Sequence, residues 1–385
     1  MAKKLLDVIS IGYGRQLFQD TNPERLRMEE CATMCRSLTM VIFTHIDDGI
    51  TKQTVDNLTI IPTNSSSRWV MLYDAFTIIN NLIKGCDHQS LVITSQDAFE
   101  TGLVAYLISV RHNIWWCIQE HADAFSGSYW RQETILNRLR YVLGKYFLRK
   151  ANVIRVVSKR IESSIKLFNI KTPINRLPVA IDTSAYLPVH SSIIKRPVNK
   201  TEFQFISVAR FVPQKNLFLL VRAFRKVYEV CPHARLVLIG QGPQHKLIQD
   251  QITKEFGLQS PDQGPVIMMS WTDDVPAFLR GADAYVLSSN YEGWGRVLIE
   301  AMCAQLPIVT TDVGCVGEVM QAGVHGIVVP VGDCDELTKA MIVMIKDTAA
   351  YQMYKKNLQG LPVHDLPGTH FKSYGQDWVR TLGVN

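Results

Sequence analysis

The chain alternates between short runs of apolar, often β-branched residues and longer segments with helical periodicity. In the first half, the short runs predict strands at 5–11, 40–44, 58–62, 90–94, 114–118 and 153–157. In the second half, they predict strands at 204–208, 235–239, 266–269, 284–287, 307–310 and 326–330. Strands that alternate with helices are typical of parallel sheets covered by helices on both faces.

Helical patterns fill the segments between these strands. In the second half they lie at 216–230, 244–256, 275–281, 295–304 and 335–346, and a last helix is expected at 370–382. In the first half, 130–150 predicts a basic helix. One stripe of that helix is apolar and consists of Ile135, Leu139, Val142, Leu143 and Phe147.

The length of 385 residues is too great for one ordinary hydrophobic core. We therefore predict an α/β protein with an N-terminal domain at 1–190, a linker at 191–202 and a second domain at 203–366. The segment 367–385 is expected to form a helix that packs back toward the N-terminal domain. Two doubly wound domains would face a central cleft, and ligands in such folds bind beyond the carboxyl ends of the strands.

Composition indicates a folded globular protein, with 47% hydrophobic and 20% charged residues. No apolar run is long enough to cross a bilayer, and the N-terminal apolar stretch contains Asp7 and lacks a cleavage site, so it reads as a strand. The eight cysteines lie mostly in apolar segments without a CxxC pair. This pattern predicts reduced thiols in a cytoplasmic protein.

The net charge of +6 is unevenly distributed. Residues 111–176 contain 13 Lys or Arg and 4 Asp or Glu. A basic segment of this kind favours an anionic partner, which could be a lipid headgroup, a phosphorylated substrate or a nucleic acid. For any single residue in it, a solvated helix face is the more ordinary explanation.

The first candidate loop runs from Ala209 to Asn216, between a strand and a helix. Arg210 and Lys215 place two cations at this turn, and the following helix is expected to present unpaired N–H groups. Fixed positive charge beside a helix N-terminus is a site for an anion such as phosphate. Basic residues are common in loops, so this loop alone is weak evidence.

The second candidate loop, 288–302, is more specific. Gly293 and Gly295 permit close approach of the backbone to a ligand before a helix begins. Glu292 precedes that helix, and Glu300 lies within it among apolar neighbours. A carboxylate on a largely buried helix needs a partner, and hydroxyl groups of a bound sugar or ribose could supply it.

Together, these loops resemble the retaining glycosyltransferases of family 4, which have the GT-B fold. The resemblance rests on Arg210-x4-Lys215, on Glu292-Gly-x-Gly with Glu300 after seven further residues, and on the segment 307–314. It covers about 203–346, most of the second domain, and the combined motif set is specific. It implies a fold of two Rossmann-like domains and transfer of a hexose from a UDP- or GDP-sugar to a glycan, glycolipid or small-molecule acceptor.

The resemblance also implies a role for each site residue. Arg210 and Lys215 would hold the diphosphate, Glu300 the ribose hydroxyls and Glu292 the hydroxyls of the transferred sugar. Backbone amides would complete the phosphate site at Gly293, Trp294, Gly295, Arg296 and Val297. The base is expected near Trp271, where the sequence departs from the family pattern, which has a glycine near position 270.

The N-terminal half matches the family less well. Gly12-Tyr13-Gly14 stands where family members carry a Gly-Gly loop, and a simple turn explains it equally well. His121 follows a predicted strand and resembles the family's His-containing loop, which would bring it to the sugar or the reacting region. We include Gly12 and Gly14 as donor-site candidates and His121 as a catalytic candidate, with Arg210, Lys215 and Glu292.

No metal ion or other cofactor is expected, because cations and helix N-termini can stabilise the departing diphosphate. The motif Asp333-Cys334-Asp335 has the form of a metal-binding DxD, but its position at a helix start favours N-capping. Two other functions stay open. Gly240-Gln241-Gly242 could belong to a dinucleotide-dependent oxidoreductase, although the third glycine of that fingerprint is missing. A non-catalytic nucleotide-binding protein on the same scaffold is the other alternative.

The expected partners are a nucleotide-sugar donor and a glycan or lipid-linked acceptor, and nucleic acid is not expected. The basic segment 111–176 suggests peripheral contact with an anionic membrane, on the inner face of the cell membrane. Its aromatic residues Trp130, Tyr141, Tyr146 and Phe147 could act as interfacial anchors.

Overall fold

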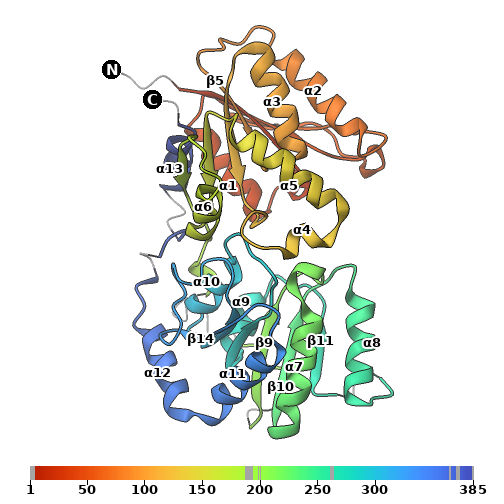
Figure 1. Cartoon of the computed structure of the whole chain (residues 1–385), viewed down its shortest axis with the longest axis vertical. Helices are drawn as coiled ribbons and strands as arrows, with labels where there is room; N and C mark the ends of the chain where they lie inside the picture. Colours follow the sequence, from red (N-terminus) through yellow and green to blue (C-terminus); the bar gives the residue numbers. More distant parts are fainter. Residues whose placement is uncertain are drawn as a thin grey trace. The chain divides into compact units, whose positions relative to one another are not determined.

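The computed structural model describes residues 5–186, 194–197, 199, 201–260, 264–363, 366–369 and 373–383. The chain forms two compact units (Figure 1). Unit 1 comprises Met1–Ala180 and His370–Asn385, and unit 2 comprises Ile181–Thr369. Residues 191–193, 198 and 200 of the expected linker at 191–202 lie outside the described residues.

Unit 1 is built on an eight-stranded sheet in the order β3-β4-β2-β1-β5-β6-β7-β8. Its strands are β1 (Asp7–Gly12), β2 (Ser37–Ile42), β3 (Gln53–Val55), β4 (Leu58–Pro62), β5 (Leu91–Ser95), β6 (Trp115–Glu120), β7 (Val153–Val156) and β8 (Ile174–Arg176). Its helices are η1 (Arg15–Phe18), α1 (Pro23–Thr33), η2 (Ile46–Asp48), α2 (Val70–Leu82), α3 (Glu100–His112), α4 (Tyr129–Glu133), α5 (Ile135–Leu148), α6 (Lys159–Lys166) and α13 (Tyr374–Thr381). Strands β1, β2 and β4–β8 pair in parallel, and only the short β3 pairs antiparallel, with β4.

The C-terminal helix α13 is an integral part of unit 1. It packs on α1, and Trp378 and Tyr374 lie in the same hydrophobic cluster as the strands β1 and β2. The buried guanidinium of Arg155 donates to the Tyr374 hydroxyl at 2.7 Å and to Gln119 Oε1 at 2.5 Å. Trp378 Nε1 donates to the same Gln119 oxygen at 3.0 Å. This polar network ties α13 to the strands β6 and β7.

Unit 2 is built on a six-stranded sheet in the order β11-β10-β9-β12-β13-β14, in which all pairs are parallel. Its strands are β9 (Phe203–Val208), β10 (Ala234–Ile239), β11 (Val266–Met269), β12 (Ala284–Leu287), β13 (Ile308–Thr311) and β14 (Gly326–Val329). Its helices are η3 (Ser184–Tyr186), η5 (Pro213–Lys215), α7 (Leu217–Val230), α8 (His245–Phe256), α9 (Val275–Gly281), α10 (Arg296–Cys303), α11 (Cys334–Lys346) and α12 (Thr348–Gln359). The segment Ser184–Tyr186, which the sequence suggested for the first domain, contacts α9 and α10 of unit 2.

Each sheet has one point at which the chain changes direction across it. In unit 2, the chain runs from β9 outward to β11 and then returns to add β12 on the other side of β9. In unit 1, the corresponding pair is β1 and β5. Ligands of doubly wound sheets bind beyond the carboxyl ends of the strands at such a switch point. The loops after β9 and β12 are therefore the first place to look for a site in unit 2.

The basic helix expected at 130–150 is in fact two helices, α4 and α5. They separate at Thr134, which is extended and whose side chain accepts a hydrogen bond from the Asn137 N–H at 3.0 Å, as an N-cap does. No described helix combines the length and the hydrophobicity that a membrane span requires.

Candidate functional site

The loop after β9 presents one exposed cation and one largely buried cation. Arg210 is exposed, and its guanidinium has no ion-pair partner among the described residues. The short helix η5 carries Lys215, whose side chain is 13% exposed. Asn216 follows in the left-handed region with φ of 45°, and its side chain accepts from the Leu219 N–H at 3.3 Å. The start of α7 is thus capped by its own side chain, so it presents fewer free N–H groups than the sequence suggested.

Hydrogen bonds join this loop to the loop after β12. The Ser288 hydroxyl donates to the Lys215 carbonyl at 2.9 Å, and the Asn290 N–H donates to the Gln214 carbonyl at 2.8 Å. The Asn216 amide donates to Asn290 Oδ1 at 2.9 Å. The two loops that flank the switch point therefore form one unit.

An ion pair between Lys215 Nζ and Glu292 Oε1 lies at the centre of this junction. The Glu292 side chain is 8% exposed, and its Oε1 also accepts from the Ser289 hydroxyl at 2.7 Å. The Gln214 amide donates to the Tyr291 carbonyl at 2.9 Å. Because both charges are largely removed from water, each depends on the other for its stability.

The helix α10 begins without a side-chain cap. Its N-cap is Gly295, which has φ of 78° and no side chain to accept from the first N–H groups. The Leu298 N–H donates to the Gly295 carbonyl at 2.9 Å. The start of a helix carries partial positive charge, which favours an anion. Trp294 precedes Gly295 and is buried, and its Nε1 has no hydrogen-bond partner among the described residues. Gly293 is also buried.

The turn after β13 packs directly under this helix start. The Cys315 N–H donates to the Trp294 carbonyl at 2.9 Å. A Cβ on Gly314 would lie 2.6 Å from that same carbonyl oxygen, and Gly314 has φ of 60°. Only glycine fits at this position, which explains the Val-Gly sequence at the end of the segment 307–314.

Glu300 is less buried than the sequence suggested. The fully buried face of α10 carries Leu298, Ile299, Ala301, Met302 and Cys303. Glu300 instead lies on the partly exposed face with Arg296 and Val297. Burial nevertheless raises the pKa of Glu300, while Arg296, a hydrogen bond from the Tyr186 hydroxyl and Lys215 act to lower this pKa.

Two further loops of unit 2 bear on the sequence predictions. Trp271, in the loop after β11, has a 53% exposed side chain. Gly240 and Gly242 do not open space for a ligand. A Cβ on Gly240 would lie 1.9 Å from the Ala209 carbonyl oxygen, and a Cβ on Gly242 would lie 2.5 Å from the Phe211 carbonyl oxygen. These glycines serve the packing of two loops, which removes the observation that suggested a dinucleotide-dependent oxidoreductase.

The DxD-like motif is a helix cap, as predicted. Asp333 Oδ1 accepts from the Asp335 N–H at 3.0 Å and from the Glu336 N–H at 2.9 Å at the start of α11. Across the described residues, no group of three or more His, Cys, Asp or Glu side chains is arranged to hold a metal ion.

The remaining predicted residues, Gly12, Gly14 and His121, lie in unit 1. Gly12 ends β1, and a Cβ there would lie 2.1 Å from Gln96 Oε1, so the glycine admits the Gln96 side chain. Gly14 is the N-cap of η1. His121 directly follows β6, and burial together with Arg155 and Arg27 lowers its pKa well below the usual value, so its imidazole is neutral.

Sequence reasoning missed three residues that the structure places beside the candidates. Tyr186 bonds to Glu300, Gln96 lies against Gly12, and Asp97 follows β5 at the switch point of unit 1. Burial raises the pKa of Asp97, although its carboxylate accepts from the Phe99 N–H at 2.8 Å and from the Thr101 hydroxyl at 2.8 Å. Asp97 could have been found as a polar residue directly after a buried strand, but nothing in the sequence pairs Tyr186 with Glu300.

The two doubly wound sheets, parallel except for the short β3, define a GT-B fold. Residues 191–360 match the family described as "Glycosyl transferases group 1". This match covers most of the second unit and less than half of the chain.

Two curated relatives match over part of their length. An uncharacterized glycosyltransferase of Methanocaldococcus jannaschii is 30% identical over 188 residues, which cover 47% of this chain and 45% of the relative. The N-acetyl-alpha-D-glucosaminyl L-malate synthase of Bacillus anthracis is 30% identical over 169 residues, 43% of each chain. The match thus spans less than half the length of these relatives.

Among solved structures, the chain is similar to Anabaena HepE in complex with UDP and glucose. The TM-score is 0.72 at 16% identity, and the similarity covers 99% of this chain and 100% of HepE. At this level of identity, the comparison shows that the fold is shared.

Proposed function

We propose that the protein is a retaining hexosyltransferase that uses a UDP- or GDP-sugar and needs no metal ion. The acceptor would be a glycan, a glycolipid or a small molecule. The single observation that carries the proposal is the joining of the Lys215 loop and the uncapped start of α10 at the switch point of unit 2. The fold is shared with a solved structure that contains UDP.

The chemistry follows from the charges at this junction. Cleavage of the bond between the anomeric carbon and the diphosphate leaves the bonding electrons, and hence negative charge, on the phosphate oxygen. Arg210, Lys215 and the positive N-terminal end of α10 would stabilise that charge where it develops. The acceptor oxygen would bond to the anomeric carbon from the face that the phosphate leaves, and its proton would pass to a phosphate oxygen. This route retains the anomeric configuration and needs no protein nucleophile.

The other site residues would position the sugar donor. Glu300 would accept hydrogen bonds from the ribose hydroxyls and Glu292 from hydroxyls of the transferred sugar, while the exposed Trp271 ring would stack on the base. If Lys215 turned from Glu292 to a phosphate, the bond from the Ser289 hydroxyl would still hold the Glu292 carboxylate. All eight cysteines are unpaired, which supports the proposal of a cytoplasmic enzyme.

A screen of sugar donors tests this proposal. Thermal stability and slow donor hydrolysis are measured with UDP-, GDP- and ADP-sugars, with and without EDTA. The proposal expects one nucleotide class to stabilise the protein and to be hydrolysed at a rate that EDTA does not change. Stabilisation without turnover on any acceptor would favour the non-catalytic alternative. An absence of stabilisation by all three classes would refute the site.

A further inference from the structure

The outward face of α5 is apolar. The exposed apolar side chains follow one another at spacings of four, three, one and three residues. Because residues three or four apart lie on the same side of a helix, these side chains form one continuous face. We call this set the α5 outer stripe. It consists of Ile135, Leu139, Val142, Leu143 and Tyr146, with exposed fractions of 79%, 58%, 66%, 51% and 45%. A surface helix ordinarily turns such a stripe toward the core, so its exposure calls for a partner.

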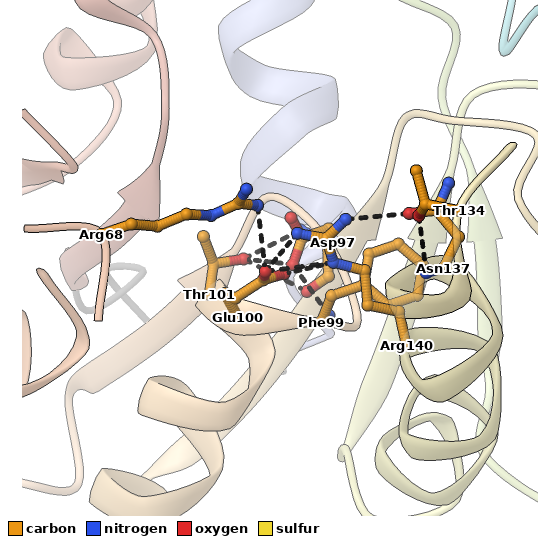
Figure 2. A network of polar contacts seen from close by, with 8 residues as sticks. All are labelled: Arg68, Asp97, Phe99, Glu100, Thr101, Thr134, Asn137 and Arg140. Carbon is orange, nitrogen blue, oxygen red and sulfur yellow. Dashed lines mark hydrogen bonds and ion pairs between the residues drawn. The ribbon is translucent and has the colours of Figure 1, made fainter.

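Polar contacts fix the opposite face of α5 to the body of unit 1. Figure 2 shows Arg140 reaching Glu100 at the start of α3, with Nε 3.0 Å from both carboxylate oxygens. The Arg140 guanidinium also donates to Asn137 Oδ1 at 2.9 Å, and the buried Asn137 amide donates to the Trp130 carbonyl at 2.8 Å. Arg68, at the other side of the network, pairs with the same Glu100.

Close packing fixes the same face. A Cβ on Gly144 would lie 2.9 Å from the Phe125 ring and 3.0 Å from the Phe99 ring, so the helix backbone sits directly on these rings. Phe147 and Leu148 are buried in the next turn. The helix cannot roll to bury its outer stripe without breaking both the Arg140–Glu100 pair and this packing. The exposure of the stripe is therefore built into the fold.

Positive charge surrounds the outer stripe. Residues 134–150 contain no Asp or Glu. Arg138 on α5 is exposed, as are Arg149 and Lys150, which directly follow its last residue. The neighbouring helix α3, whose Tyr106 hydroxyl lies 3.1 Å from that of Tyr146, adds exposed Arg111.

We propose that the α5 outer stripe and its flanking cations bind an anionic lipid surface. A helix with an apolar face and lysine or arginine beside it lies in the interface of a bilayer, where the side chains enter the acyl boundary and the cations meet the headgroups. A second copy of the chain is a poorer occupant, because pairing through this face would bring like charges together without acidic partners. The inference stands on α5 alone and does not depend on the proposed function.

The structure shows which of the aromatic residues suggested as membrane anchors are exposed. Phe147 is buried, and Trp130 stacks on Phe99 with ring centroids 4.9 Å apart. Tyr141 is half-buried, and Arg131 lies over its ring. Of the four anchors that the sequence suggested, Tyr146 is the one that belongs to the outer stripe.

Vesicle co-sedimentation tests the proposal with the full chain. Vesicles of phosphatidylcholine and phosphatidylglycerol in equal parts are compared with vesicles of phosphatidylcholine alone. The triple variant Leu139→Gln/Val142→Gln/Leu143→Gln is expected to lower the partition coefficient about tenfold or more. The double variant Arg138→Gln/Lys150→Gln is expected to lower it by about 25-fold, from about fivefold for each cation.

Matched controls remove exposed residues of the same types from unit 2. They are Val230→Gln/Leu247→Gln/Met353→Gln and Lys346→Gln/Lys356→Gln, and both should bind as the wild type does. Equal thermal unfolding temperatures show that all variants are folded. The proposal would be overturned if the wild type bound both vesicle types equally or bound neither. It would also be overturned if the triple variant bound as tightly as the wild type. A wild-type dimer that the triple variant converts to a monomer, without lipid binding, would assign the face to self-association instead.

Discussion

The ammonium group of Lys215 pairs with the carboxylate of Glu292, and this contact joins the loops that follow β9 and β12. In sequence, the strands β10 and β11 lie between the two residues. The residues meet because β9 and β12 are neighbours in the sheet. Their side chains are 13% and 8% exposed. The pair therefore holds two charges at a position where the protein itself excludes most of the water.

Removal of one partner of this pair should be costly, because it leaves the other charge buried and uncompensated. We expect Lys215→Met to lower the free energy of unfolding by about 3 kcal/mol and Lys215→Met/Glu292→Gln to recover a large part of that loss. Urea denaturation of the two single variants and the double variant measures the coupling. Strictly additive losses would mean that the two charges are stabilised independently.

The pH dependence of sugar-donor binding should report on Glu300. Burial raises the pKa of this carboxyl group, and the hydrogen bond from Tyr186 lowers it. If the ionised carboxylate accepts from ribose, affinity for UDP-glucose falls as the pH drops through the pKa of Glu300. Tyr186→Phe removes a contact that lowers this pKa, so the loss should begin at a higher pH.

Calorimetric titration of UDP-glucose between neutral and acidic pH measures this midpoint. Glu300→Gln provides the control, since it removes the titrating group and should flatten the curve. An identical midpoint in the wild type and in Tyr186→Phe would show that the Tyr186 contact does not control the ionisation of Glu300.

Gly314 should be far less tolerant of substitution than Gly317, although both have positive φ, of 60° and 78°. Alanine at either position incurs the cost of left-handed backbone, about 1 kcal/mol. At Gly314, the new Cβ would also meet the Trp294 carbonyl oxygen, whereas nothing lies within 4 Å at Gly317. We expect about 3 kcal/mol of destabilisation for Gly314→Ala and about 1 kcal/mol for Gly317→Ala. Equal thermal shifts would contradict this packing.

Arg140 and Arg138 offer a comparison within one helix. Arg140 and its partner Glu100 are each 17% exposed, whereas Arg138 is exposed. Arg140→Ala should lower the free energy of unfolding by about 2 kcal/mol, and Arg138→Ala should change it by less than about 0.5 kcal/mol. Chemical denaturation checks both values. A negligible effect of Arg140→Ala would show that the network in Figure 2 does not hold α5 in place.

The strands could be predicted closely from the sequence because each is a short buried run bounded by turn residues. The predicted strand 58–62 coincides with β4 (Leu58–Pro62), and 266–269 coincides with β11 (Val266–Met269). The short strands β3 and β8 were missed, because they are only partly buried and carry no apolar run. The motifs around Arg210 and Glu292 were also visible, since glycines and charges stand out after apolar strands.

Contacts that depend on the order of strands or on the rotation of a helix could not be predicted. Nothing in the sequence indicates that Asn290 lies against Gln214, because β12 returns to β9 across the sheet. The apolar stripe of α5 predicted a helix, but the direction in which Leu139 and Val142 point depends on Gly144 and Arg140, which pack on residues from other elements.

Binding of one diphosphate by the Arg210 loop and the start of α10 can be measured with the variant Arg210→Gln. Arg210 is exposed and has no ion-pair partner among the described residues, so its replacement should leave the fold intact, and Arg222→Gln is a matched exposed control in the same unit. Titration calorimetry compares UDP with uridine, which lacks the diphosphate. We expect Arg210→Gln to weaken UDP binding about tenfold or more and to leave uridine binding unchanged. Unchanged UDP affinity, or an equal loss for uridine, would contradict this expectation.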